Sequence, residues 1–179
     1  MVFTEDAFLS ETAKARPRLS EFCIGSGLDI GFGGDSIVPR AITMDMDKPY
    51  TQVGSNPQQL YGDCRVLPFL SGSLDFIYSS HLIEDFYWNE IKLILNEWIR
   101  VLKHSGKIIL YQPDQQAYLE HCKKTGQGIG NQNHKEQDFS LSAFKRIVLS
   151  DIPHQILLEF NEPEERTGYS FGLVLKVKQ

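Results

Sequence analysis

The chain has 179 residues, of which 41% are hydrophobic, 11% aromatic and 23% charged, with a formal net charge of −5. This composition is typical of one folded domain and argues against a disordered chain. The net negative charge provides no electrostatic attraction to the phosphate backbone of a nucleic acid. The apolar runs are far shorter than the roughly 20 residues of a membrane span. We therefore expect a single domain over residues 1–179, with no nucleic acid partner and no membrane association.

Residues 1–20 mix acidic and basic side chains and lack the apolar run and cleavage site of a secretion signal. We expect a helical segment there. The three cysteines, Cys23, Cys64 and Cys122, are odd in number and include no CxxC pair. This usage favours reduced thiols and a cytoplasmic protein.

Short strand-like runs alternate with helical patterns along the chain, which favours a parallel sheet covered on both faces. A helix is predicted over residues 88–103 from apolar residues at three-and-four spacing, with Gly106 as a left-handed cap. A second helix is predicted over residues 140–149, capped by Ser140. The expected strands are residues 28–31, 41–46, a short 65–67, 74–80, 107–112, 155–160 and 170–178, the last as an edge strand.

These elements predict an α/β fold, a doubly wound, mostly parallel sheet with an antiparallel final strand. Glutamine, glycine and asparagine dominate residues 126–133, which predicts a loop. Residues 115–139, which contain it, are the candidate substrate loop.

The first strand runs straight into a glycine cluster, GLDIGFGGDS at residues 27–36. Gly31 and Gly33 allow a sharp turn and a close approach to a ligand, and amides at the start of a short following helix can bind an anion or carboxylate. Ser36 stands where a dinucleotide motif has its third glycine. On this motif alone, a plain structural turn is the alternative.

The second strand ends near Asp45, whose carboxylate can accept both hydroxyls of a ribose at the switch point of the sheet. Asp47 is the competitor for this role. The alternative to both is that Asp45 and Asp47 are solvent-exposed carboxylates in a turn and bind no ribose. Only 14 positions separate Gly31 from Asp45, so the helix between them is expected to have one or two turns and to end near Pro39.

Four segments carry a family resemblance by their order and spacing. They are LDIGFG at residues 28–33, GDCRVLPF at 62–69, LDFIYSSHLIE at 74–84 and EWIRVLKHSG at 97–106. Together they resemble the class I S-adenosylmethionine-dependent methyltransferases, especially the type 11 group. In the last segment, His104 and Ser105 replace the proline and first glycine of the family's RVLKPGG pattern.

The resemblance implies S-adenosylmethionine as cofactor and assigns parts of the site to it. Asp29 would organise the glycine turn near the amino acid portion of the cofactor, Gly31 and Gly33 would contact that portion, and Asp45 would hold the ribose.

On the adenine side, the resemblance implies that Asp63 accepts from the adenine amino group and that Cys64 lies beside the ring. Ser80 and His81 would face the methionine portion and the substrate entrance. The predicted cofactor-binding residues are therefore Asp29, Gly31, Phe32, Gly33, Asp45, Met46, Asp63, Cys64 and Ser80.

Methyl transfer depends largely on alignment of nucleophile and methyl, and a general base is needed only for an acidic proton. His81 is a candidate base because histidine titrates near neutrality, and the alternative is that it orders the loop after the fourth strand with Glu84. His134 is the second catalytic candidate, and its alternative is a solvated loop. His121, Cys122 and His134 share no recognised ligand spacing, so no metal is predicted.

The predicted function is S-adenosylmethionine-dependent methyl transfer to a small-molecule or saccharide-type acceptor. Residues 130–139 resemble a segment of methyltransferases encoded near surface-polysaccharide genes, which suggests the saccharide. A homodimer that completes the pocket is a candidate assembly. The alternatives are a non-catalytic S-adenosylmethionine-binding partner or sensor protein and, as a lesser alternative, a nicotinamide-dependent oxidoreductase.

Overall fold

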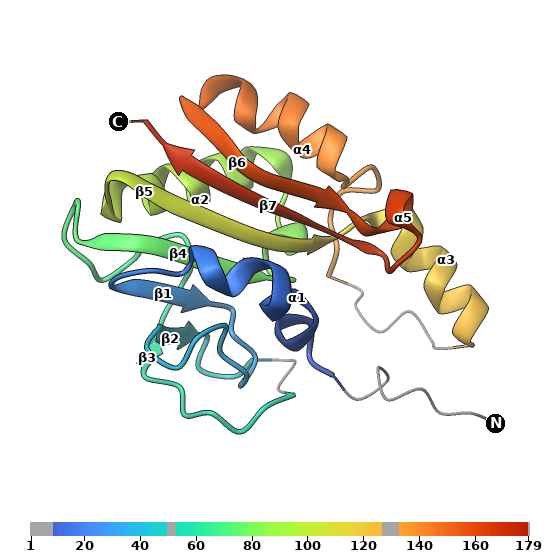
Figure 1. The fold of residues 1–179 in the computed structure, drawn as a ribbon, viewed down its shortest axis with the longest axis horizontal. Coiled ribbons are helices and arrows are strands. Elements are labelled where there is room, and N and C mark those ends of the chain that lie inside the picture. The colour runs from blue at the N-terminus through green and yellow to red at the C-terminus, as the bar shows by residue number, and fades with distance from the viewer. Residues whose placement is uncertain (1–8, 50–52, 127–132, 179) are drawn as a thin grey trace.

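The computed structural model describes residues 9–49, 53–126 and 133–178 (Figure 1). These residues build a seven-stranded sheet in the order β3-β2-β1-β4-β5-β7-β6. In sheet order, the strands from β3 through β2, β1 and β4 to β5 pair in parallel. Strand β7 runs antiparallel to both β5 and β6. The predicted α/β class with an antiparallel final strand is confirmed. The strands are β1 Gly27–Ile30, β2 Ile42–Asp45, β3 Leu60–Tyr61, β4 Leu74–Ser80, β5 Leu102–Pro113, β6 His154–Asn161 and β7 Ser170–Val177.

The α-helices cover the two faces of the sheet unequally. Residues of α2 and α4 share one core cluster with β1, β4, β5 and β7. Residues of α1 belong to a second cluster against the other face, and Figure 1 shows α1 crossing that face. The helices are α1 Glu11–Leu19, α2 Trp88–Val101, α3 Gln115–Thr125, α4 Leu141–Ile147 and α5 Glu162–Glu165.

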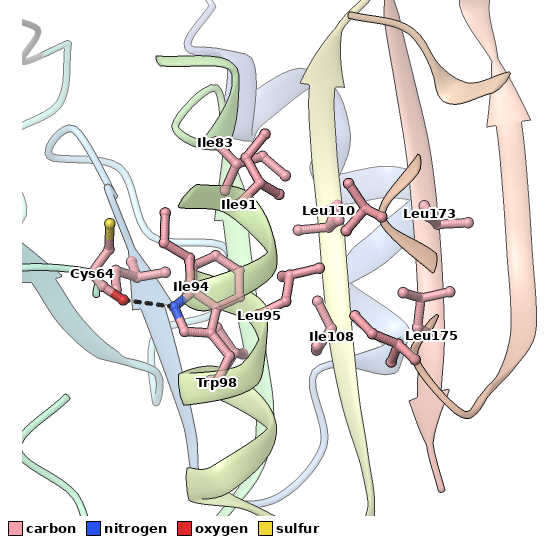
Figure 2. Close-up of a cluster of buried hydrophobic side chains, with 14 of the residues drawn as sticks. Cys64, Ile83, Ile91, Ile94, Leu95, Trp98, Ile108, Leu110, Leu173 and Leu175 are labelled. Carbon is pink, nitrogen blue, oxygen red and sulfur yellow. Dashed lines mark hydrogen bonds between the residues drawn. The ribbon is translucent and has the colours of Figure 1, made fainter. Parts of the chain in front are cut away.

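Helix α2 buries the apolar stripe that its sequence predicts. In Figure 2 the stripe turns Leu95 toward β5, with β7 beyond, and Trp98 toward Cys64. Its largest side chain, Trp98, is fully buried and donates from Nε1 to the backbone oxygen of Cys64 at 3.0 Å. The helix thereby fixes the segment that follows β3. The labelled residues of the stripe are Ile91, Ile94, Leu95 and Trp98.

The connection from β1 to β2 contains no helix in the described residues, so the predicted short helix is wrong. Gly31, Gly33 and Gly34 have φ values of 68°, 57° and 91°, which an α-helix does not accommodate. The amide of Ile37 donates to the Asp29 carboxylate at 2.6 Å instead of to a helical carbonyl. Side-chain and turn contacts therefore hold this connection as irregular structure.

Two strand predictions need correction. The short third strand is Leu60–Tyr61 and not residues 65–67, because the Asp63 carboxylate accepts from the amide of Arg65 and closes a turn there. The predicted edge strand at residues 170–178 is β7, which lies between β5 and β6 and is almost wholly buried. At this end of the sheet the edge strand is β6.

Two further local predictions are also corrected. The left-handed residue after α2 is Ser105, with a φ of 64°, and not Gly106. The first part of the 115–139 segment is helix α3, begun by Asp114, whose side chain accepts from the amide of Ala117. Residues 127–132 of the predicted loop lie outside the described residues, as do residues 1–8 of the predicted N-terminal segment.

The helix predicted after Ser140 is confirmed as α4, and its cap hydroxyl accepts from the amide of Ala143 at 3.2 Å. Cys23, Cys64 and Cys122 are buried free thiols. Within the ranges that the structure describes, no helix is long and apolar enough to cross a membrane. The single-domain organisation stays a prediction.

Candidate functional site

A cavity of about 960 Å³ opens at the carboxyl ends of β1, β2 and β4. Its wall combines the glycine turn, the end of β2, residues 61–65 and the residues that follow β4. Residues 9–12, before and at the start of α1, close another side. Open α/β sheets bind their ligands at this edge, because the strand order reverses there and leaves a crevice.

The buried carboxylate of Asp29 holds the glycine turn in place from inside the protein. This side chain is fully buried and accepts from the amide of Ile37, so it organises the turn without lining the cavity. The amide of Gly31 donates to the backbone oxygen of Met44 at 2.9 Å, which ties the turn to β2. A Cβ on Gly31 would lie 3.0 Å from Leu82, so the turn has little room for a side chain.

Burial raises the pKa of the Asp29 carboxyl to about 8. The hydrogen bond from the amide of Ile37 offsets this rise in pKa only in part. Its Oδ1 has no hydrogen-bond partner among the described residues. The folded protein therefore holds a proton on this carboxyl at neutral pH.

We expect Asp29→Asn to flatten the dependence of stability on pH. The folded pKa lies above 3.8, the usual pKa of an aspartate carboxyl, so the stabilising contribution of this proton is fully present below pH 4 and is lost as the pH rises to about 8. The wild type should lose up to about 1.4 kcal/mol per pH unit in this window through this group. Urea unfolding of both proteins from pH 4 to pH 8 measures the slopes, and equal slopes would contradict the assignment.

Asp45 lies at the end of β2 and connects this strand to the glycine turn. Its Oδ2 accepts from the amide of Gly33 at 3.2 Å, and its Oδ1 accepts from the amide of Met46 at 2.8 Å. Partial burial raises the pKa of this carboxyl. Asp47 also lines the cavity but is exposed. The geometry favours Asp45 for the ribose, and this role stays a prediction.

Asp63 and Cys64 line the cavity beyond β3. The guanidinium of Arg65 contacts both carboxylate oxygens of Asp63 at 2.7–3.0 Å and lowers the pKa of that carboxyl. Burial raises the pKa of the Cys64 thiol to about 12, so this sulfur is an apolar wall group and not a nucleophile. An adenine amino group at Asp63 would share the carboxylate with Arg65.

Ser80 and His81 line the cavity after β4. His81 adopts a φ of 49°, and its amide donates to the backbone oxygen of Tyr111 at 3.0 Å. Its Nε2 lies 3.1 Å from Ser170 Oγ and 3.4 Å from Glu11 Oε2. Burial lowers the pKa of the imidazole, partly offset by the charge of Glu11.

His134 does not line the cavity, although its neighbours Asn133 and Lys135 do. Its side chain is only 4% exposed, so the solvated-loop alternative is wrong. Its Nδ1 lies 2.5 Å from Gln115 Oε1, and burial lowers the pKa of the imidazole to about 4. The substrate contact predicted for His134 therefore lacks direct access to the cavity.

The sequence reading missed the contribution of residues 9–12 and the burial of Glu84. The segment 9–12 reaches the cavity only through the packing of α1, which no local pattern encodes. The sequence suggests Glu84 only as a partner of His81, and Glu84 Oε1 does lie 3.8 Å from His81 Nδ1. The three-residue spacing of this pair was the available signal.

Comparison with known proteins gives a matching family model and a shared fold. Residues 28–110 match the family model described as a methyltransferase domain. No curated protein matches the sequence significantly. The site described above lies largely within the matched residues.

Solved structures share the fold at low sequence identity. An S-adenosylmethionine-dependent methyltransferase from Archaeoglobus fulgidus is 15% identical with a TM-score of 0.65, covering 96% of this chain and 97% of that one. A Haloferax volcanii protein in complex with the Trm112 methyltransferase activator is 14% identical with a TM-score of 0.68, covering 97% and 91%. The PH0226 protein from Pyrococcus horikoshii is 19% identical with a TM-score of 0.65, covering 86% and 82%.

The family match agrees with the motifs, with the sheet order and with the position of the cavity. The cofactor implied by the family is S-adenosylmethionine. Residues 28–110 therefore resemble a methyltransferase domain, and the chain shares its fold with S-adenosylmethionine-dependent methyltransferases.

Proposed function

We propose that the cavity binds S-adenosylmethionine across the glycine turn, Asp45 and Asp63, and presents its methyl group to a small-molecule or saccharide-type acceptor. The observation that carries this proposal is that one continuous cavity is lined by residues of all three cofactor motifs. The residues present fit the cofactor, since a side chain on Gly31 would crowd Leu82 and the Asp45 carboxylate lies in the wall. When bound, the cofactor supplies an electrophilic methyl group.

The protein's own contribution is chiefly alignment. Gly31 and Gly33 leave room for close approach, and the Asp45 carboxylate can accept two hydroxyl protons at once. His81 lies in the wall on the same side as Glu11 and is the proposed base for an acceptor with an acidic proton.

The polar groups of the cavity wall support this acceptor class. Glu11, His81, Asp85, Asn133 and Lys135 contribute hydrogen-bonding groups there. Such groups recognise hydroxyl-bearing molecules, because each hydroxyl both donates and accepts. The net charge of −5 also supports a small acceptor over a nucleic acid.

Asp45→Ala is expected to weaken the binding of S-adenosylmethionine and its demethylated product at least about tenfold, since a charged hydrogen-bond partner of the ribose is lost. Calorimetry with both ligands and with NAD measures this. Asp47→Ala is the matched control and should bind like the wild type. NAD binding alone, or binding of none of the three, would contradict the proposed site, and a loss confined to Asp47→Ala would move the ribose to that residue.

Turnover separates an enzyme from a non-catalytic partner or sensor. The expected result is conversion of S-adenosylmethionine to its demethylated product when saccharides or other hydroxyl-bearing small molecules are added. The Haloferax volcanii neighbour is bound to an activator protein, so the assay is also run with the chain's co-purifying partners. We further propose a cytoplasmic location from the three free cysteines, and size-exclusion chromatography tests the homodimer.

A further inference from the structure

Glu84 is a buried carboxylate that accepts no hydrogen bond from the described residues. It lies in the short 3-10 helix Ile83–Asp85, directly after the cavity residues that follow β4, and is 1% exposed. Neither of its carboxylate oxygens has a hydrogen-bond partner among the described residues. Burial of a charged group is costly unless it is paired or binds a metal, so this position calls for a positive ligand or a proton.

Two imidazoles face the same oxygen of Glu84. His134 Nε2 lies 3.7 Å and His81 Nδ1 lies 3.8 Å from Glu84 Oε1. These distances are too long for hydrogen bonds. They are close to the roughly 3.4 Å that separates two ligand atoms on one tetrahedral metal ion with bonds of about 2.1 Å.

The outer contacts of the two histidines orient their inner nitrogens toward Glu84. His134 Nδ1 lies 2.5 Å from the amide oxygen of Gln115, which only accepts, so this nitrogen carries the proton and Nε2 does not. His81 Nε2 lies 3.1 Å from Ser170 Oγ and 3.4 Å from Glu11 Oε2, and these contacts turn its Nδ1 toward Glu84. Metal-binding histidines are oriented by this type of contact.

We propose that Glu84, Asp85 and His134 bind a divalent transition metal ion, with His81 at the edge of the same site. One ligand atom from each of the three lies within 4.8 Å of the others. Two carboxylates and an imidazole suit Mn²⁺, Co²⁺ or Zn²⁺ better than a soft metal that requires thiolates. The inference goes beyond methyl transfer, which needs no metal, and does not depend on it.

The site lies behind the cavity wall. Asp85 and His81 line the cavity, while Glu84 and His134 are buried behind them. An ion can therefore enter through the cavity and keep one side open toward it. Lys135 also lines this wall, and its backbone amide donates to the backbone oxygen of Glu84 at 3.0 Å, which fixes the two segments against each other.

The test uses the tag-free full chain, stripped with a chelator and titrated with Co²⁺ alone while its visible absorption is followed. We expect saturable binding of one equivalent, and calorimetry with Zn²⁺ and Mn²⁺ repeats the measurement. Glu84→Gln and His134→Gln should each weaken Co²⁺ binding at least about tenfold. His104→Ala, an exposed histidine outside the cluster, is the matched control and should bind like the wild type.

Absence of saturable Co²⁺ binding by the wild type would overturn the proposal. So would equal affinities in the wild type and both variants, provided that circular dichroism shows all three folded. Binding of S-adenosylmethionine is measured separately in the same variants. If the wild type binds Co²⁺ but not the cofactor, this inference stands and the proposed function is contradicted. If it binds the cofactor but not Co²⁺, the proposed function stands and this inference is contradicted.

Discussion

Replacement of Trp98 by alanine is expected to lower the free energy of unfolding by about 3–5 kcal/mol. The indole is fully buried where α2 packs against the sheet, and its removal leaves a cavity that the surrounding strands cannot fill (Figure 2). Urea denaturation of the wild type and the variant measures the difference. A loss below about 1 kcal/mol would show that this helix face is not part of the cooperative core.

Trp98→Phe separates packing from hydrogen bonding. It keeps a ring but loses the Nε1 donor to the Cys64 backbone oxygen, and a buried acceptor left alone costs about 1–3 kcal/mol. Because Cys64 lines the cavity, we also expect weaker cofactor binding. Trp88→Phe is the matched control, since Trp88 is only partly buried and its Nε1 lies 3.4 Å from Asp138 in a solvent-exposed contact. Equal effects of the two Phe variants would contradict this assignment.

The elements that the sequence predicted well are those with one dominant local signal. Strand β4 is an apolar run, and α2 has its apolar residues on one face, so burial fixes both. The connection from β1 to β2 was mispredicted as a helix because its structure depends on a side chain from another element, Asp29, that accepts from Ile37. The interior position of β7 depends on its pairing with both β5 and β6, which its own alternation does not encode.

The site was predictable wherever a residue follows a parallel strand. Gly31, Asp45 and Ser80 end β1, β2 and β4 or follow directly, so the sheet itself brings them to one edge. His134 and Glu84 lie on irregular segments that meet only in the folded chain. Sequence spacing alone therefore placed His134 on a solvated or substrate-facing loop, whereas packing buries it behind the wall.

The glycine loop offers the second large effect, at Gly34. This residue has a φ of 91°, and a Cβ on it would lie 2.4 Å from the backbone oxygen of Gly54. The same two segments are joined by hydrogen bonds from the amide of Val53 to the backbone oxygen of Gly33 at 2.8 Å and from the amide of Asn56 to that of Gly34 at 2.9 Å. A side chain at this position must therefore push apart two backbone segments, and Gly33 and Val53 of these segments line the cavity.

Gly34→Ala should cost about 1–2 kcal/mol for the left-handed backbone and a further 1–3 kcal/mol for the displaced segment, and cofactor affinity should fall about tenfold or more. Gly72→Ala separates the two contributions. Gly72 has a φ of 66° but no atom within 4 Å of an added Cβ, so only the backbone cost applies and cofactor binding should be unchanged. Denaturation and calorimetry on both variants measure these values. If Gly34→Ala matched Gly72→Ala in stability and in affinity, the close approach of the two loops would not shape the cofactor site.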